Sequence, residues 1–172
     1  MRCLLDKMIA RYALQGLLKL AEGQELNDDE LLTLDLVERA NSQQIDLFIA
    51  SQTGNVLGKI AQLPRYVELI RMFLAQVDIL FPSRYFRRWS RRLRDYNFTR
   101  EDAAILALAT FGTNDKGTIL GMHVVATYDQ PMMNQWHLQQ TSIQERFADM
   151  KRDLTLPYNQ AVLPDVLRPE QI

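Results

Sequence analysis

Short apolar runs alternate with longer segments of helical periodicity along this chain of 172 residues. The first apolar run, Cys3-Leu4-Leu5, ends at Asp6 and predicts a buried strand. Runs of the same kind predict three more strands, at 45–50, 77–81 and 122–127. Apolar residues three and four positions apart predict helices at 7–21, 28–40, 52–62, 65–76, 83–96, 100–111 and 142–154.

Strands that alternate with helices are typical of an α/β fold with a parallel sheet, because each connection is long enough for a crossover helix. The length favours one domain. We expect an α/β domain at 1–140 and, packed on it, a helical and proline-containing extension at 141–172. Pro157, Pro164 and Pro169 disfavour a regular helix in the last part of that extension.

The composition excludes several classes of protein. The single cysteine, Cys3, allows no internal disulfide framework and no cysteine-based zinc site, and two histidines cannot build a multi-histidine metal centre. No apolar run reaches the roughly 18 residues that span a bilayer, so no membrane contact is expected. The first residues lack the long apolar stretch of a secretory signal, which favours a cytoplasmic location.

The net charge of −1 conceals an uneven distribution. Residues 83–102 carry 7 basic and 3 acidic residues, whereas residues 1–82 carry 8 basic and 11 acidic residues. Six arginines follow one another with no acid between them, at Arg84, Arg87, Arg88, Arg91, Arg92 and Arg94. The chain is therefore not basic throughout, and its positive charge is concentrated in one short segment.

On a helical wheel the arginines fall beside an apolar stripe formed by Tyr85, Trp89, Leu93 and Tyr96. We expect the stripe to pack on the sheet, with Trp89 in the core, and the arginines to face solvent. Guanidinium groups bind two phosphate oxygens at once, which predicts nucleic-acid binding. The alternative is a solvated face whose charges pair with local acids such as Asp95.

Three carboxylates stand where chemistry is expected. Asp6 follows the first strand and Asp129 follows the fourth, and ligands of open α/β sheets bind beyond the carboxyl ends of strands. Asp102 stands near a helix start. Carboxylates that converge would favour a hard cation such as Mg²⁺. Each acid also has an ordinary structural interpretation: Asp6 as a helix cap, Asp102 in a capping box with Thr99, and Asp129 in a turn.

Three segments of the chain resemble PIN domains, a family of nucleases. The first is Cys3-Leu4-Leu5-Asp6, and the second is the helix start Phe98-Thr99-Arg100-Glu101-Asp102 with the Ala-Ala-Ile-Leu-Ala run that follows it. The third is Val124-Val125-Ala126-Thr127-Tyr128-Asp129. The second segment is the most specific, and together the three frame about residues 1–137.

The resemblance implies a three-layer α/β/α fold with a central parallel sheet of about four to five strands. It also implies that Asp6, Asp102 and Asp129 are catalytic and bind Mg²⁺ or Mn²⁺, with Thr127 as a supporting polar residue. The chain departs from the family pattern at Lys7-Met8 and at Gln130-Pro131-Met132, and it has no acid at 51–58. Asn55 and Glu101 are the residues that could supply the missing oxygen ligand.

These features support three hypotheses. The first is a metal-dependent ribonuclease that cleaves single-stranded or structured RNA. The second is a degenerate PIN-like protein that binds RNA without cutting it. The third is a protein-interaction module, either a homodimer or a toxin-like domain held by an antitoxin-like partner.

Overall fold

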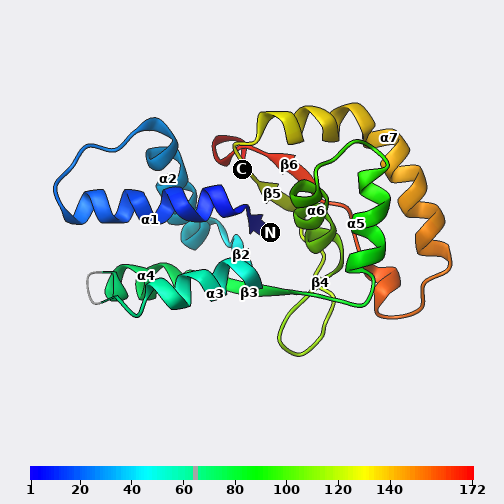
Figure 1. The fold of residues 1–172 in the computed structure, drawn as a ribbon, viewed down its shortest axis with the longest axis horizontal. Helices are drawn as coiled ribbons and strands as arrows, with labels where there is room; N and C mark the ends of the chain where they lie inside the picture. Colours follow the sequence, from blue (N-terminus) through cyan, green and yellow to red (C-terminus); the bar gives the residue numbers. More distant parts are fainter. Residues whose placement is uncertain (64–65) are drawn as a thin grey trace. The chain divides into compact units, whose positions relative to one another are not determined.

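The computed structural model describes residues 1–63 and 66–172 (Figure 1). The described residues form an α/β structure with seven α-helices and six strands. The strands are β1 Arg2–Leu5, β2 Asp46–Ala50, β3 Val77–Pro82, β4 Gly112–Thr113, β5 Val124–Ala126 and β6 Asp165–Leu167. The α-helices are α1 Lys7–Ala21, α2 Asp28–Gln43, α3 Ser51–Ile60, α4 Val67–Leu74, α5 Phe86–Arg94, α6 Arg100–Phe111 and α7 Gln130–Arg152. Two 3-10 helices, η1 Tyr158–Gln160 and η2 Pro169–Gln171, lie near the C-terminus.

The strands form one mostly parallel sheet in the order β4-β3-β2-β1-β5-β6. β1 runs parallel to β2, with Cys3 opposite Leu47 and Leu5 opposite Ile49. β4 is antiparallel to β3. The α/β class is thus confirmed, but the expected number of four to five strands is too low. β4 and β6 have only 2 and 3 residues, which is too short for a recognisable apolar run.

Most helix positions agree with the apolar periodicity, and α1 and α6 have the predicted bounds. The last α-helix is the exception, since it begins at Gln130 and not at 142. Asp129 caps it, and Pro131 is tolerated in the first helical turn because the missing N–H has no helical partner there. The expected domain boundary at 140 falls inside this continuous helix. In the described part of the chain, no helix has the length and apolar character needed to cross a membrane.

The chain divides into two compact units. The first unit comprises Met1–Ile79, Ala126–Tyr128 and Leu167–Ile172, and its core includes the fully buried Leu4, Leu5 and Ile9. Cys3 is also buried in this core, and burial raises the pKa of its thiol to about 12, so the thiol is not a ready nucleophile.

The second unit comprises Leu80–Val125 and Asp129–Val166. Its core contains a cluster of aromatic rings. The ring centroid of Trp89 lies 5.4 Å from that of Phe147 and 6.5 Å from that of Phe111. Since Trp89 is 0% exposed, this cluster fixes α5 to the rest of the unit through one face.

Candidate functional site

Six arginines lie on the opposite face of α5 and just before its first residue. We call them the arginine surface: Arg84, Arg87, Arg88, Arg91, Arg92 and Arg94. Arg92 is half-buried and the other five are exposed. Trp89 and Leu93 on the apolar stripe are both 0% exposed. The sequence prediction of an amphipathic helix with Trp89 in the core is therefore confirmed.

The arginine surface has no carboxylate partner within the described residues. Asp95, the nearest acid in sequence, is paired instead with Arg146 of α7, with 2.9 Å between Oδ2 and Nη2. Asp95 thus forms its ion pair with a residue outside the arginine surface. Burial, followed by the positive charges of Arg88 and Arg146, lowers the pKa of Arg92 below its ordinary 12.5. The charges of Asp153 and Asp95 act on Arg92 in the opposite direction, but more weakly than these like charges.

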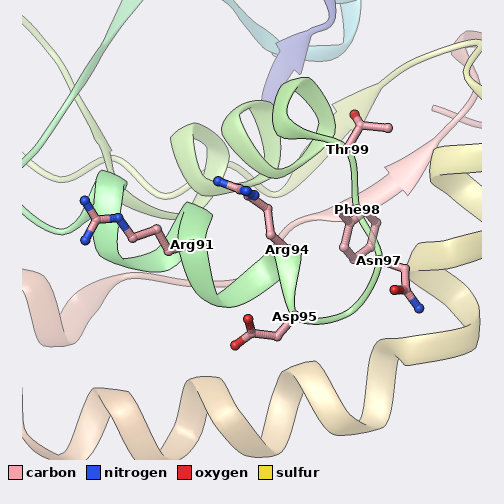
Figure 2. Close-up of a pocket in the computed structure, with 6 residues that line it drawn as sticks. All are labelled: Arg91, Arg94, Asp95, Asn97, Phe98 and Thr99. Atoms are coloured by element: carbon pink, nitrogen blue, oxygen red, sulfur yellow. The ribbon is translucent and has the colours of Figure 1, made fainter.

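An open, shallow pocket of about 630 Å³ adjoins one end of the arginine surface (Figure 2). Six residues at the end of α5 and in the turn before α6 line it: Arg91, Arg94, Asp95, Asn97, Phe98 and Thr99. Figure 2 shows Arg91 and Arg94 extending from the same side of α5, whereas Asp95 points toward α7. Two guanidinium groups thus remain available to an anion in this pocket.

The turn between α5 and α6 shapes the pocket. Asn97 has a φ of 64°, in the left-handed region that asparagine tolerates better than most residues. The turn places Thr99 as the cap of α6: its Oγ1 accepts from the N–H of Asp102 at 3.1 Å. Oδ2 of Asp102 accepts from the N–H of Thr99 at 3.3 Å, which completes the capping box. The capping interpretation of Asp102 is confirmed.

Asp129 also caps a helix. Its Oδ1 accepts from the N–H of Met132 at 2.9 Å, at the start of α7. This bond satisfies one of the amide groups that lack a helical partner at the start of a helix. Asp129 therefore introduces a long helix, and the interpretation as an isolated turn is wrong.

Hydrogen bonds of Asp6 connect the ends of β1 and β5. Its Oδ1 accepts from the N–H of Lys7 at 2.6 Å, and its Oδ2 accepts from the hydroxyl of Thr127 at 3.1 Å. Its N–H also donates to the carbonyl of Ala126 at 3.0 Å. The structure thus brings together Asp6 and Thr127, which lie 121 positions apart in the chain. The capping interpretation of Asp6 is confirmed as well.

The other expected ligands lie on helices. Asn55 is exposed on α3, and Glu101 is exposed in the first turn of α6. Asp6 belongs to the first unit, whereas Asp102 and Asp129 belong to the second. Within residues 1–63 and 66–172, no group of three or more His, Cys, Asp or Glu is placed so that it could hold a metal ion. The metal site therefore stays a prediction.

Sequence reasoning missed two features. The first is the pocket beside the arginines, which the turn residues Asn97 and Thr99 help to line. Asn97 stands three residues before a predicted helix start, and an asparagine in that place is a usable turn signal. A second cavity in the first unit is lined by α1, α3 and α4. Its sign is structural, because Val56 on α3 remains exposed beside it, and the sequence pattern alone does not reveal that exposure.

No protein-family model and no curated protein matches the chain. The similarity to PIN domains therefore depends on the three sequence segments quoted above.

Proposed function

We propose that this chain is a PIN-like protein, with the helices covering both faces of its sheet, that binds single-stranded RNA through the arginine surface. One observation carries the proposal. Helix α5 buries its apolar face, and the six arginines on and beside it form no ion pair with a carboxylate in the described part of the protein. Side chains three and four positions apart on a helix stand about 5–6 Å from each other, so a row of guanidinium groups can contact several phosphates of one strand.

Two alternative explanations of the arginine surface, the helix dipole and a lipid surface, fit the structure less well. Arg91, Arg92 and Arg94 lie in the last turn of α5, where cations favour the helix dipole. Arg84, Arg87 and Arg88 precede that turn, so the dipole does not explain them. Contact with a lipid surface is also disfavoured, because the apolar face of α5 is buried in the core and cannot insert into a membrane.

The test is fluorescence anisotropy with a labelled single-stranded RNA of mixed sequence, titrated with the whole chain. Charge reversal at Arg87, Arg88 and Arg91 is expected to weaken binding by about 100-fold or more, because each lost phosphate contact also removes the release of counterions. For the unchanged protein, the logarithm of affinity is expected to fall linearly with the logarithm of salt concentration, with a slope of about −2 to −4.

The matched control reverses three exposed cations outside the arginine surface: Lys59, Arg71 and Arg152. It changes the net charge by the same amount, so it is expected to retain most of the affinity. Equal loss in the two triple variants would mean that only total charge matters, and affinity that does not respond to salt would exclude phosphate contacts. Since phosphate contacts carry no sequence information, RNAs of different sequence are expected to bind alike.

A metal-dependent ribonuclease is a second candidate, favoured by the contact between Asp6 and Thr127 at the ends of two strands. Mg²⁺ or Mn²⁺ would supply an activated water, and Asp6, Asp102 and Asp129 are the proposed ligands. Each of these carboxylates caps a helix in the described structure, so we assign no hydrolytic step to them.

Cleavage of the same RNA with Mg²⁺ or Mn²⁺ tests this candidate. Asp6→Asn is a suitable variant because asparagine also caps helices well and preserves the start of α1. The ribonuclease candidate predicts cleavage that both a chelator and Asp6→Asn abolish. Cleavage that survives both would come from a contaminating nuclease or from another site.

A further inference from the structure

Helices α1, α3 and α4 of the first unit, which Figure 1 labels, line an open cavity of about 570 Å³. Its walls are mainly aliphatic, with Leu14 and Leu18 from α1, Val56 and Ile60 from α3, and Leu69 from α4. The volume lies within the range of about 300–1,000 Å³ that is typical of small-molecule sites.

The apolar walls are incompletely covered by the protein itself. Val56 is 55% exposed and Ile60 is 38% exposed, although both are aliphatic residues on a helix that packs in the first unit. Water in contact with these side chains is released when an apolar ligand enters, which favours binding. The cavity therefore selects a ligand with a hydrocarbon body.

The charged residues that line the cavity determine which charge the head group of a ligand can have. Lys7 and Arg11 stand one turn apart on α1, and both line the cavity. Arg11 is exposed and has no carboxylate partner among the described residues. The lining residues that the structure describes include no Asp or Glu. A negative head group is thus attracted, and a positive one is repelled.

We propose that this cavity binds a medium-chain aliphatic carboxylate, with the hydrocarbon chain between α1 and α3 and the carboxylate against Arg11. Arg11 contributes a planar pair of donors that matches the two oxygens of a carboxylate. The cavity belongs to the first unit and the arginine surface to the second, so this proposal is independent of RNA binding.

Isothermal titration calorimetry of the whole chain with decanoate, below its micelle concentration, tests the proposal. We expect saturable binding at one site, with decan-1-ol binding more weakly. Arg11→Gln is expected to weaken decanoate binding by about tenfold, the equivalent of one charge-assisted hydrogen bond, and to change decan-1-ol binding by less than about twofold. Val56→Glu, which places a carboxylate in the apolar wall, is expected to abolish the binding of both ligands.

The matched controls lie outside the cavity. Arg71→Gln removes an exposed cation on α4, and Leu31→Gln replaces a leucine on α2 that is 57% exposed. Both are expected to bind decanoate like the unchanged protein. Circular dichroism checks that every variant is folded.

Three outcomes would overturn the proposal. The first is no saturable heat with decanoate, and the second is Arg11→Gln binding decanoate as tightly as the unchanged chain. The third comes from light scattering of the ligand-free protein. A dimer that Val56→Glu converts to a monomer would show that a second copy of the chain covers the cavity.

Discussion

Helices α2 and α5 are both densely charged, but only α2 uses its charges inside the fold. The carboxylate of Glu30 accepts from the N–H of Asn27 at 2.9 Å and from Nζ of Lys19 at 2.7 Å. Asp35 pairs with Arg39 one turn later, at 2.7 Å. The acids of the first turn also face the positive end of the helix dipole. The charges of α2 are therefore accounted for by the stability of the first unit.

Helix α5 shows the opposite pattern. Asp95, which follows it in the chain, is paired with Arg146 of α7. Arg88 and Arg146 act as like charges on Arg92 and outweigh the opposite charges of Asp153 and Asp95. The comparison shows that charge density alone does not identify a ligand-binding helix. The deciding observation is whether the fold supplies each charge with an ion-pair partner, and for the arginines of α5 the described residues supply none.

The largest expected effect comes from removing the side chain that anchors α5. Trp89→Ala leaves a cavity between Phe111 and Phe147 and is expected to destabilise the protein by about 3–5 kcal/mol. Urea unfolding followed by far-ultraviolet circular dichroism measures the loss. Arg91→Ala on the exposed face of the same helix is the control, with an expected change within about 0.5 kcal/mol. Similar losses in the two variants would mean that α5 is not anchored through its apolar face.

A smaller effect is expected where α2 uses a charge. The hydrogen bond from Lys19 and the N–H of Asn27 lower the pKa of Glu30 below its ordinary 4.5. A lowered pKa in the folded state stabilises the protein above the unfolded pKa, and the stabilisation is lost as the pH falls through the folded value. Glu30→Gln is thus expected to lower the free energy of unfolding at pH 7, by less than Trp89→Ala does.

The dependence on pH distinguishes this charge effect from a loss of packing. The difference between the unchanged protein and Glu30→Gln is expected to be constant above pH 4.5 and to shrink at lower pH. Glu38→Gln, exposed on the same helix, serves as the control and is expected to show almost no difference. A difference that persists unchanged in acid would mean that Glu30 acts by packing and not by its charge.

The same contrast explains what the sequence could and could not predict. The apolar periods of α1 and α6 and the stripe through Trp89 are local, so the pattern alone predicts their position and their buried face. The pairing of β4 and β6 was out of reach because these strands are held by partners far along the chain, such as Phe81 opposite Thr113. Strands of 2 or 3 residues are too short to show a repeating pattern of apolar and polar residues.

The candidate site was predictable to a similar degree. The arginines are visible as a cluster in the sequence. The resemblance to PIN domains names Thr127 as a supporting residue, and the structure shows its hydroxyl bonded to Asp6, but the role of both residues in a site stays a prediction. The partner of Asp95 was not predictable, because Arg146 lies 51 positions away on a helix whose start was misplaced. A charge is assigned a role only after its three-dimensional partners are known.

The smallest expected effects separate the two helices most directly, since one arginine is removed from each. Arg39→Ala loses the bond to Asp35 and the bond from Nη2 to the carbonyl of Pro169, at 3.1 Å, and is expected to cost about 0.5–1 kcal/mol. Arg88→Ala loses no partner and relieves repulsion on Arg92, so a change between zero and a gain of about 0.5 kcal/mol is expected. Urea unfolding at low and high salt measures both variants. Added salt is expected to reduce either difference, because it screens the attraction at Arg39 and the repulsion at Arg88 alike. A clear loss of stability in Arg88→Ala would show that the arginine surface has a structural role, and its lack of ion pairs would then no longer favour a nucleic-acid ligand.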